Sequence, residues 1–364
     1  MFDKEFIDES LGSKLCTLLI IKSPSSETQA INFLTRYLKS KFTKRVIGFD
    51  LEFNTPPGSK GQRQIAIFQI SFYLKKYILT IFFNPKLVTL ETNQLIHKLL
   101  IAPNIMKIGH GTDSLDIPAI YGYLNDTQKI IDFTCSLYDT RFLCEFENIL
   151  LGTKLCNIYH LLEKFQVITP KQLKWLKTNE EKLGEFWRKT IDLTNLPNGL
   201  RDYSMYDALY LKRLLVKMKR YFKLKKWDYN LVIQTTRLVF LIKREIIKFN
   251  DISYLNLYYL SNKSKLYDLF YIFYNDWLTQ LETNQIGILG IGYFKNQLIK
   301  ILSHGFYLLI CSTNQVNKSS HQILGYEQIA ELKDGWNKLN NYLKLFPKVN
   351  KLIIDFLKFV KSRL

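Results

Sequence analysis

The segment that most constrains the fold is VIGFDLEF, residues 46–53, an apolar run that contains two carboxylates. In a β-strand, successive side chains point to opposite faces, so Asp50 and Glu52 are expected on the same face. Like charges held that close repel and raise a pKa, unless a cation lies between them. An isolated Asp-x-Glu is more often a solvent-facing pair at a strand end, so this segment alone leaves both interpretations open.

The pattern around this segment predicts a mixed α/β domain. Strands are expected at 46–53, 65–74, 76–83, 104–110 and 129–133. Helices are expected at 26–40, 89–101, 114–124, 136–148, 155–166 and 202–224. The order is three strands in a meander followed by alternating helices and strands, which gives a five-stranded mixed sheet flanked by helices.

A second, mainly helical and basic region is expected after this domain. Its helices are expected at 227–249, 263–283 and about 346–362, with a strand at 305–313. We therefore predict two domains, residues 1–224 and 225–364.

Two other places contain acidic residues that could serve chemistry. Asp113 and Asp116 follow the strand at 104–110, where either could instead favour a helix start as a cap or a first-turn acid. Tyr203 and Asp207 stand four residues apart, on one face of a predicted helix. Each of these patterns is common by itself.

In order and spacing, FDLEF, HGTDSLDI and YSMYD resemble the three motifs of the DEDD exonuclease superfamily. The Tyr203-x-x-x-Asp207 form resembles its tyrosine-bearing subgroup, and KIGHGTDSLDI is most similar to RNase D and the exosome-associated RNase D-type exonucleases. Gln69, the YDT of residues 138–140 and CNIYHLLEKF extend the similarity, which covers residues 45–215. The resemblance implies a ribonuclease H-like sheet and 3′→5′ hydrolysis of phosphodiester bonds.

The resemblance also implies a two-metal site, with Mg²⁺ or Mn²⁺ as the two divalent cations. Asp50 would bridge both ions, Glu52 and Asp207 would hold the ion that activates water, and Asp116 would support the other. Tyr203 would orient the attacking water rather than act as a strong base, because an ordinary tyrosine pKa is near 10.

The second motif departs from the family pattern by one residue. The family aspartate usually stands five residues after the histidine, a position that Leu115 occupies here. We assign the role to Asp116, one residue later and before an apolar residue, and keep Asp113 as the alternative.

Four further residues are candidates for substrate binding. They are Phe53, His110, Lys60 and Arg63. Phe53 could wedge against a terminal base or pack in the core, and His110 could approach the terminal nucleotide or serve packing. Lys60 and Arg63 lie in a turn-rich loop next to Glu52.

Charge is unevenly distributed along the 364 residues. The chain carries 51 Lys and Arg against 32 Asp and Glu, a net charge of +19. Residues 1–210 hold 26 basic and 22 acidic side chains, a net of +4, which leaves +15 for residues 211–364. Such an excess favours a polyanionic partner, through the counterions released when phosphates are neutralised.

Cysteine spacing and hydropathy argue against several classes of protein. The five cysteines, at 16, 135, 144, 156 and 311, include no Cys-x-x-Cys pair, which argues against zinc and against a disulfide framework. The acidic N-terminal residues do not resemble a signal peptide, and no apolar run reaches the roughly 20 residues of a membrane span. We expect a soluble intracellular protein of cytoplasm or nucleus, encoded by an AT-rich, viral or protist, genome.

The sequence therefore predicts a metal-dependent 3′→5′ exonuclease that acts on nucleic acid, with RNA favoured over DNA by the HGTDSLD text. A DNA exonuclease of repair or proofreading type is the first alternative. The second is a non-catalytic nucleic-acid-binding protein on an exonuclease scaffold, against which the joint presence of Asp50, Glu52, Tyr203 and Asp207 counts.

Overall fold

A computed structural model describes residues 2–40, 45–55, 63–151, 156–185, 190–244, 246, 272–280, 302, 337, 340–341 and 343–363. The chain divides into two compact units. Met1–Cys144 and Lys154–Tyr221 form the first, and Glu145–Thr153 and Phe222–Leu364 form the second.

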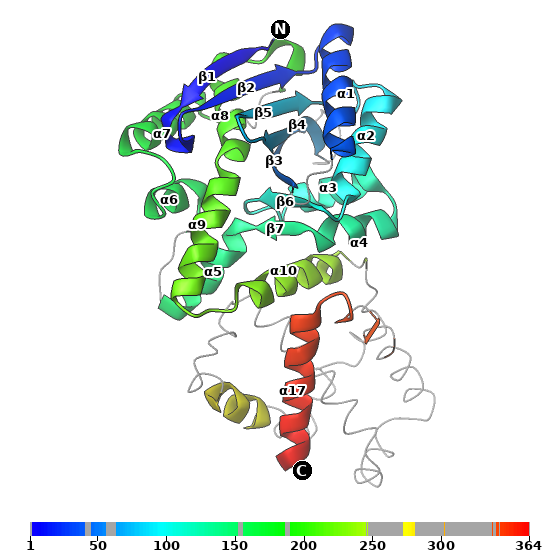
Figure 1. The fold of residues 1–364 in the computed structure, drawn as a ribbon, viewed down its shortest axis with the longest axis vertical. Coiled ribbons are helices and arrows are strands. Elements are labelled where there is room, and N and C mark those ends of the chain that lie inside the picture. Colours follow the sequence, from blue (N-terminus) through cyan, green and yellow to red (C-terminus); the bar gives the residue numbers. More distant parts are fainter. Residues whose placement is uncertain are drawn as a thin grey trace. The chain divides into compact units, whose positions relative to one another are not determined.

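A seven-stranded mixed sheet lies at the centre of the first unit (Figure 1). Its strands are β1 (Lys4–Asp8), β2 (Lys14–Ile20), β3 (Arg45–Asn54), β4 (Gln64–Tyr73), β5 (Tyr77–Phe83), β6 (Ile105–Gly109) and β7 (Leu137–Asp139). They are arranged in the order β1-β2-β5-β4-β3-β6-β7, with the β3–β4–β5 meander antiparallel and β6 and β7 parallel to β3. The predicted fold class, a mixed sheet flanked by helices, is confirmed, but the sheet has seven strands rather than five.

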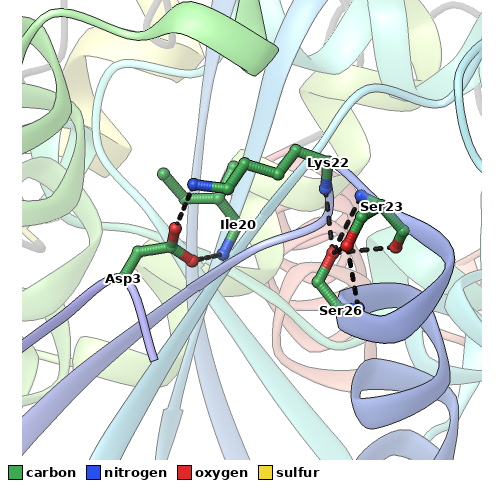
Figure 2. A network of polar contacts seen from close by, with 5 residues as sticks. All are labelled: Asp3, Ile20, Lys22, Ser23 and Ser26. Carbon is green, nitrogen blue, oxygen red and sulfur yellow. Dashed lines mark hydrogen bonds and ion pairs between the residues drawn. The ribbon is translucent and has the colours of Figure 1, made fainter. Parts of the chain in front are cut away.

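The two additional strands at one edge are β1 and β2, which form an antiparallel hairpin before the region of motif similarity. β2 joins the rest of the sheet by parallel pairing with β5. Asp3 ties this hairpin to the following helix, because its carboxylate accepts from Ile20 N at 2.8 Å and pairs with Lys22 Nζ at 2.5 Å (Figure 2). Ser23 and Ser26 then form a capping box that starts the helix.

The prediction of a strand at residues 129–133 is wrong. These residues lie in helix α4 (Thr127–Cys135), whose start is capped by Asp126, which accepts from Lys129 N at 2.8 Å. A short apolar run such as KIIDF looks the same in a buried strand and on the buried side of a helix. The strand at this sheet edge is instead β7, three residues long.

Helices cover both faces of the sheet. The helices described up to residue 224 are α1 (Pro24–Lys39), α2 (Leu90–Ile101), α3 (Asp116–Leu124), α4, α5 (Thr140–Leu151), α6 (Ile158–Lys164), α7 (Pro170–Leu183), α8 (Asn198–Leu209) and α9 (Leu211–Leu224). On one face, Phe72 of β4 packs edge-on against Phe33 and Tyr37 of α1, and Phe49 of β3 packs against Phe133 of α4. α8 crosses β3, β4 and β5 on the other face, as the separation of α1 and α8 in Figure 1 shows.

The described part of the second unit is helical. α10 (Tyr229–Lys243) packs against α17 (Pro347–Arg363), and residues 272–280 form a further helix. Trp277 packs against Phe356 of α17, with ring centroids 5.0 Å apart. The predicted strand at 305–313 and most of the predicted helix at 263–283 lie outside the described residues.

One disulfide joins Cys144 of α5 to Cys156, with the Cα atoms 5.7 Å apart. The cysteine spacing argues against a disulfide framework, but it does not anticipate this single pair. Its separation of 12 residues carries no pairing signal in the sequence. Within the described residues, no helix combines the length and apolarity needed to cross a bilayer.

Candidate functional site

Three carboxylates from two distant segments meet over the centre of the sheet. Asp50 and Glu52 come from β3 and point to the same face, as their alternation requires. Asp207 comes from α8, which crosses that face. Oxygen atoms of the three side chains all lie within 4.8 Å of one another. We call these three residues the acidic cluster.

A glycine lets α8 approach β3 closely enough to form the acidic cluster. Gly48 precedes Asp50 by two residues and faces the same side of the sheet. A Cβ at Gly48 would lie 2.5 Å from the carbonyl oxygen of Ala208 and 2.4 Å from Tyr73 Oη. Any side chain at position 48 would therefore push away the helix turn that carries Asp207.

A tyrosine hydroxyl from β4 fixes the C-terminal end of α8. Tyr73 Oη donates to the carbonyl of Ala208 at 2.6 Å and accepts from Lys212 N at 3.3 Å. Residues 208 and 212 would pair directly in a continuous helix, so the hydroxyl is inserted into the helical hydrogen-bond ladder. The predicted helix 202–224 is accordingly divided at Tyr210 into α8 and α9.

Asp116 is the first residue of α3 and lies at the edge of the acidic cluster. Its side chain is buried, and the charges of Asp50 and Glu52 act on it, although it is not one of the three residues within 4.8 Å. Asp113, in the preceding turn, instead has Arg141 Nη1 3.9 Å from its carboxylate. Burial and charge therefore favour Asp116 over Asp113 as the residue that faces the cluster.

The acids of the cluster and Asp116 are held in a way that favours their protonated forms. Burial raises the pKa of Asp50, and burial together with the charge of Asp50 raises the pKa of Glu52. The pKa values of Asp116 and Asp207 lie well above their usual range, because desolvation and the charges of Asp50 and Glu52 disfavour both carboxylates. A divalent cation between these oxygens would compensate the repulsion that raises the pKa values.

Neutral hydrogen-bond donors orient the two β3 carboxylates. Gln69 of β4 pairs with Asp50 across the strands; its side-chain amide bonds Asp50 and, at 3.4 Å, Glu52 Oε1. Ser204 Oγ of α8 donates to Glu52 Oε1 at 3.2 Å. The other amide atom, Gln69 Oε1, is buried with no donor among the residues that the structure describes, and a metal-bound water could donate to it. The cluster therefore fits a hard, oxygen-liganded cation such as Mg²⁺ or Mn²⁺.

Two tyrosines lie beside Asp207. Tyr203, one turn earlier in α8, donates a side-chain hydrogen bond to Asp207, and the charge of Asp207 together with burial keeps its own pKa well above the usual value. Tyr159 of α6 bonds to Glu180 of α7, and burial and Asp207 also raise its pKa. Both hydroxyls therefore remain protonated donors at neutral pH.

Of the four residues proposed for substrate binding, the three that the structure describes are not part of the acidic cluster. His110 Nδ1 lies 2.9 Å from Thr140 Oγ1, and burial lowers the pKa of His110 to about 4, so the imidazole is neutral. Phe53 follows a register irregularity in β3 and is half-buried, and Arg63 is exposed just before β4. Lys60 lies outside the described residues.

Several contributors to the site have little or no signal in the sequence. These contributors are Gly48, Tyr73, Tyr159, Glu180 and Ser204. Ser204 could have been noticed, because it lies three residues before Asp207 and so on the same side of α8. Tyr73 and Tyr159 could not, because their partners come from elements more than 20 residues away in the sequence.

The fold and site define a mixed α/β protein with a carboxylate cluster between the interior strand β3 of its sheet and helix α8. No protein-family model matches the sequence. A curated relative, the uncharacterized protein L533 of Acanthamoeba polyphaga mimivirus, is 27% identical over an alignment of 364 positions, gaps included, which covers 87% of this chain and 68% of the relative.

Similar solved structures include three nuclease-related chains. The Nibbler EXO domain of Aedes aegypti has a TM-score of 0.41 at 14% identity, covering 59% of this chain and 93% of that one. RNase D of Trypanosoma brucei in complex with RNA U12 has a TM-score of 0.39 at 16% identity, covering 55% of this chain and 62% of that one. Brucella melitensis NrnC with bound Mg²⁺ has a TM-score of 0.37 at 11% identity, covering 62% and 92%. At TM-scores below 0.5, these similarities assign no role to any residue of this chain.

Proposed function

We propose that this protein is a metal-dependent 3′→5′ exonuclease of the tyrosine-bearing DEDD type, with RNA favoured over DNA as substrate. The observation that carries the proposal is the acidic cluster. Two motifs separated by about 150 residues supply three carboxylates, two from β3 and one from α8, with one oxygen of each within 4.8 Å of the others. Asp116 from the remaining motif lies at its edge.

The residues of the site have separate tasks in this proposal. Asp50, Glu52 and Asp207 would hold the divalent cations, with Asp116 supporting one of them. When bound, the cations would activate water and stabilise charge on the attacking and departing oxygens of the phosphodiester. Tyr203, a protonated donor already bonded to Asp207, is suited to orient the attacking water. Gln69 and Ser204 hold the β3 carboxylates in place.

Substrate identity and polarity can be tested together. The purified chain is incubated with 3′- or 5′-labelled single-stranded RNA, single-stranded DNA and duplexes, in Mg²⁺, Mn²⁺ or EDTA. We expect stepwise release of nucleotides from the 3′ end of RNA, abolished by EDTA. Degradation of DNA alone would indicate the repair or proofreading alternative. Binding without any cleavage would indicate the non-catalytic scaffold.

The cluster acids are tested by Asp50→Asn and Asp207→Asn. We expect each to lower the rate more than about 100-fold, since loss of an outer-shell partner of a metal already costs about 10–100-fold. Asp202→Asn is the matched control, because Asp202 also lies in α8 but pairs with Lys4 and Arg201. Circular dichroism checks that all three variants fold. Activity near that of the wild type in both cluster variants would refute the metal site.

The second-motif ligand is tested by Asp116→Asn against Asp113→Asn. We expect the first to lose activity and the second to retain most of it, because only Asp116 is buried against the charges of the cluster. The measurement is the initial rate over a range of Mn²⁺ concentrations, which separates weaker metal binding from a lower maximal rate. The opposite result would assign the role to Asp113.

A further inference from the structure

A basic pocket of about 340 Å³ opens beside α9, and the acidic cluster contributes no residue to it. Its cationic lining residues are Lys14, Lys212, Arg213, Lys217 and Arg220. We call these five residues the basic pocket cations. Tyr73, whose hydroxyl separates α8 from α9, also lines the pocket.

The helical repeat of α9 accounts for this concentration of charge. Leu214, Leu215 and Met218 face inward and are buried. Four of the five cations occur at positions 212, 213, 217 and 220, so they fall on the other side of the helix, where successive turns align them. Lys14, at the start of β2, adds the fifth cation from the sheet.

The described part of the chain does not pair this charge with carboxylates. Lys14 Nζ donates to the carbonyl of Leu74 at 3.1 Å and Lys217 Nζ to that of Gln166 at 2.6 Å, while Lys212 Nζ lies 5.5 Å from the ring centroid of Tyr73. Among the residues that the structure describes, no carboxylate forms an ion pair with any basic pocket cation.

The lysine pKa values agree with an uncompensated cluster. Burial and the charge of Lys14 lower the pKa of Lys212. Burial and the charges of Arg213 and Arg220 lower the pKa of Lys217. Each cation therefore repels its neighbours, and an anion in the pocket would relieve that repulsion.

We propose that the basic pocket binds the phosphate groups of a nucleic-acid backbone, at a place separate from the acidic cluster. Arg213 and Arg220 are about 10 Å apart along α9 at 1.5 Å per residue, which suits several phosphates in a row better than one small anion. Arginine also matches phosphate geometry with paired donors. Val216, 42% exposed, adds an apolar contact between the cations for a sugar or base.

The pocket and the acidic cluster touch neighbouring parts of β4. Gln69 reaches the acidic cluster and Tyr73 lines the pocket, four residues or about 13 Å further along the strand. Contacts to phosphates position a nucleic-acid strand on the protein without reading its base sequence. The inference shares with the proposed function only the class of partner and does not depend on cleavage.

The test compares the triple variant Arg213→Gln, Lys217→Gln, Arg220→Gln with wild type. Binding of a fluorescent single-stranded RNA of about 20 nucleotides is measured by anisotropy in EDTA, between about 50 and 200 mM salt. We expect affinity to fall about tenfold or more at the lower salt. The slope of log affinity against log salt should decrease by about 2, at about 0.7 per cation lost.

A matched control replaces three exposed lysines of α7, Lys171, Lys174 and Lys177, by glutamine. Equal losses in both triple variants, or no change in either affinity or slope, would overturn the proposal. Loss of binding only to phosphatidylserine vesicles, with RNA affinity unchanged, would overturn it in favour of a membrane surface.

The same data separate this inference from the proposed function. If the wild-type protein cleaves no substrate but the triple variant loses RNA affinity, the pocket proposal is supported and the exonuclease proposal is refuted. If the wild-type protein is active and the triple variant binds RNA like wild type, the exonuclease proposal is supported and the pocket proposal is refuted. Thermal unfolding verifies that the variants fold, and we expect no decrease in Tm, because the substitutions remove like charges from the surface.

Discussion

At the scale of single residues, the site consists of acids that the fold stabilises poorly in their charged form. Burial raises the pKa of Asp50 to about 7, and burial together with Asp50 raises that of Glu52 to about 8. Their ordinary values are near 4. The folded protein thus binds protons that the unfolded chain has released over that interval, and its stability must depend on pH.

Without metal, we expect stability to fall as pH rises from about 5 to 8, because the folded state binds more protons than the unfolded state in this window. Glu52→Gln should make the decline shallower and raise stability at pH 8. Chemical denaturation in EDTA at several pH values measures both effects. Glu91→Gln, at an exposed position of α2, is the control and should leave the slope unchanged. A wild-type stability that is flat or rises over this window would contradict the expectation.

At the scale of elements, the site depends on how closely α8 lies on β3. Gly48 provides the space, and the Tyr73 hydroxyl replaces one hydrogen bond of the helical ladder with two of its own. Both features act on the turn that contains Asp207. Small displacements there would separate Asp207 from Asp50 and Glu52, so the geometry of the cluster is sensitive to packing some distance from it.

Gly48→Ala should reduce activity strongly and destabilise the protein by about 1–3 kcal/mol, the usual cost of overpacking. Its Cβ would meet backbone at 2.5 Å, which cannot rotate away. Gly122→Ala in α3 is the matched control, because a Cβ there meets nothing within 4 Å and alanine favours helix. Unfolding in urea and the rate of nucleotide release are measured for both variants. Equal stability and activity in the two would refute the role of close approach.

The elements also show how far sequence could predict this molecule. Period-two alternation was sufficient to put Asp50 and Glu52 on one face, and a spacing of four was sufficient to put Tyr203 beside Asp207. The break at Tyr210 could not be predicted, because it is caused by Tyr73, more than 130 residues earlier. The KIIDF segment is helical rather than extended, which its sequence does not show, because a short apolar run does not distinguish strand from helix.

At the scale of the whole molecule, the chain consists of two compact units, and all four acids of the proposed site belong to the first. Ligand binding stabilises only the folded unit that binds it. The charge is divided along the sequence as well, with +4 in residues 1–210 and +15 in residues 211–364.

We therefore expect two thermal unfolding transitions. Mg²⁺ or Mn²⁺ should raise the unfolding temperature of the first unit only. At about 100 times the Kd the gain should be about 2.7 kcal/mol. Differential scanning calorimetry with and without metal measures it, and Asp207→Asn should abolish the shift. A shift of both transitions, or one that persists in Asp207→Asn, would contradict a metal site confined to the acidic cluster.

The N-terminal hairpin has a practical consequence for dissecting this protein. Asp8, at the end of β1, accepts from Tyr210 Oη at 2.7 Å, at the junction where α8 gives way to α9. The motifs begin only near residue 45, yet a fragment cut there would lose this hydrogen bond and the sheet edge against which Tyr206 and Tyr210 pack. We therefore expect that a fragment that keeps the fold of the first unit must start before β1, well upstream of the boundary that motif similarity alone would suggest.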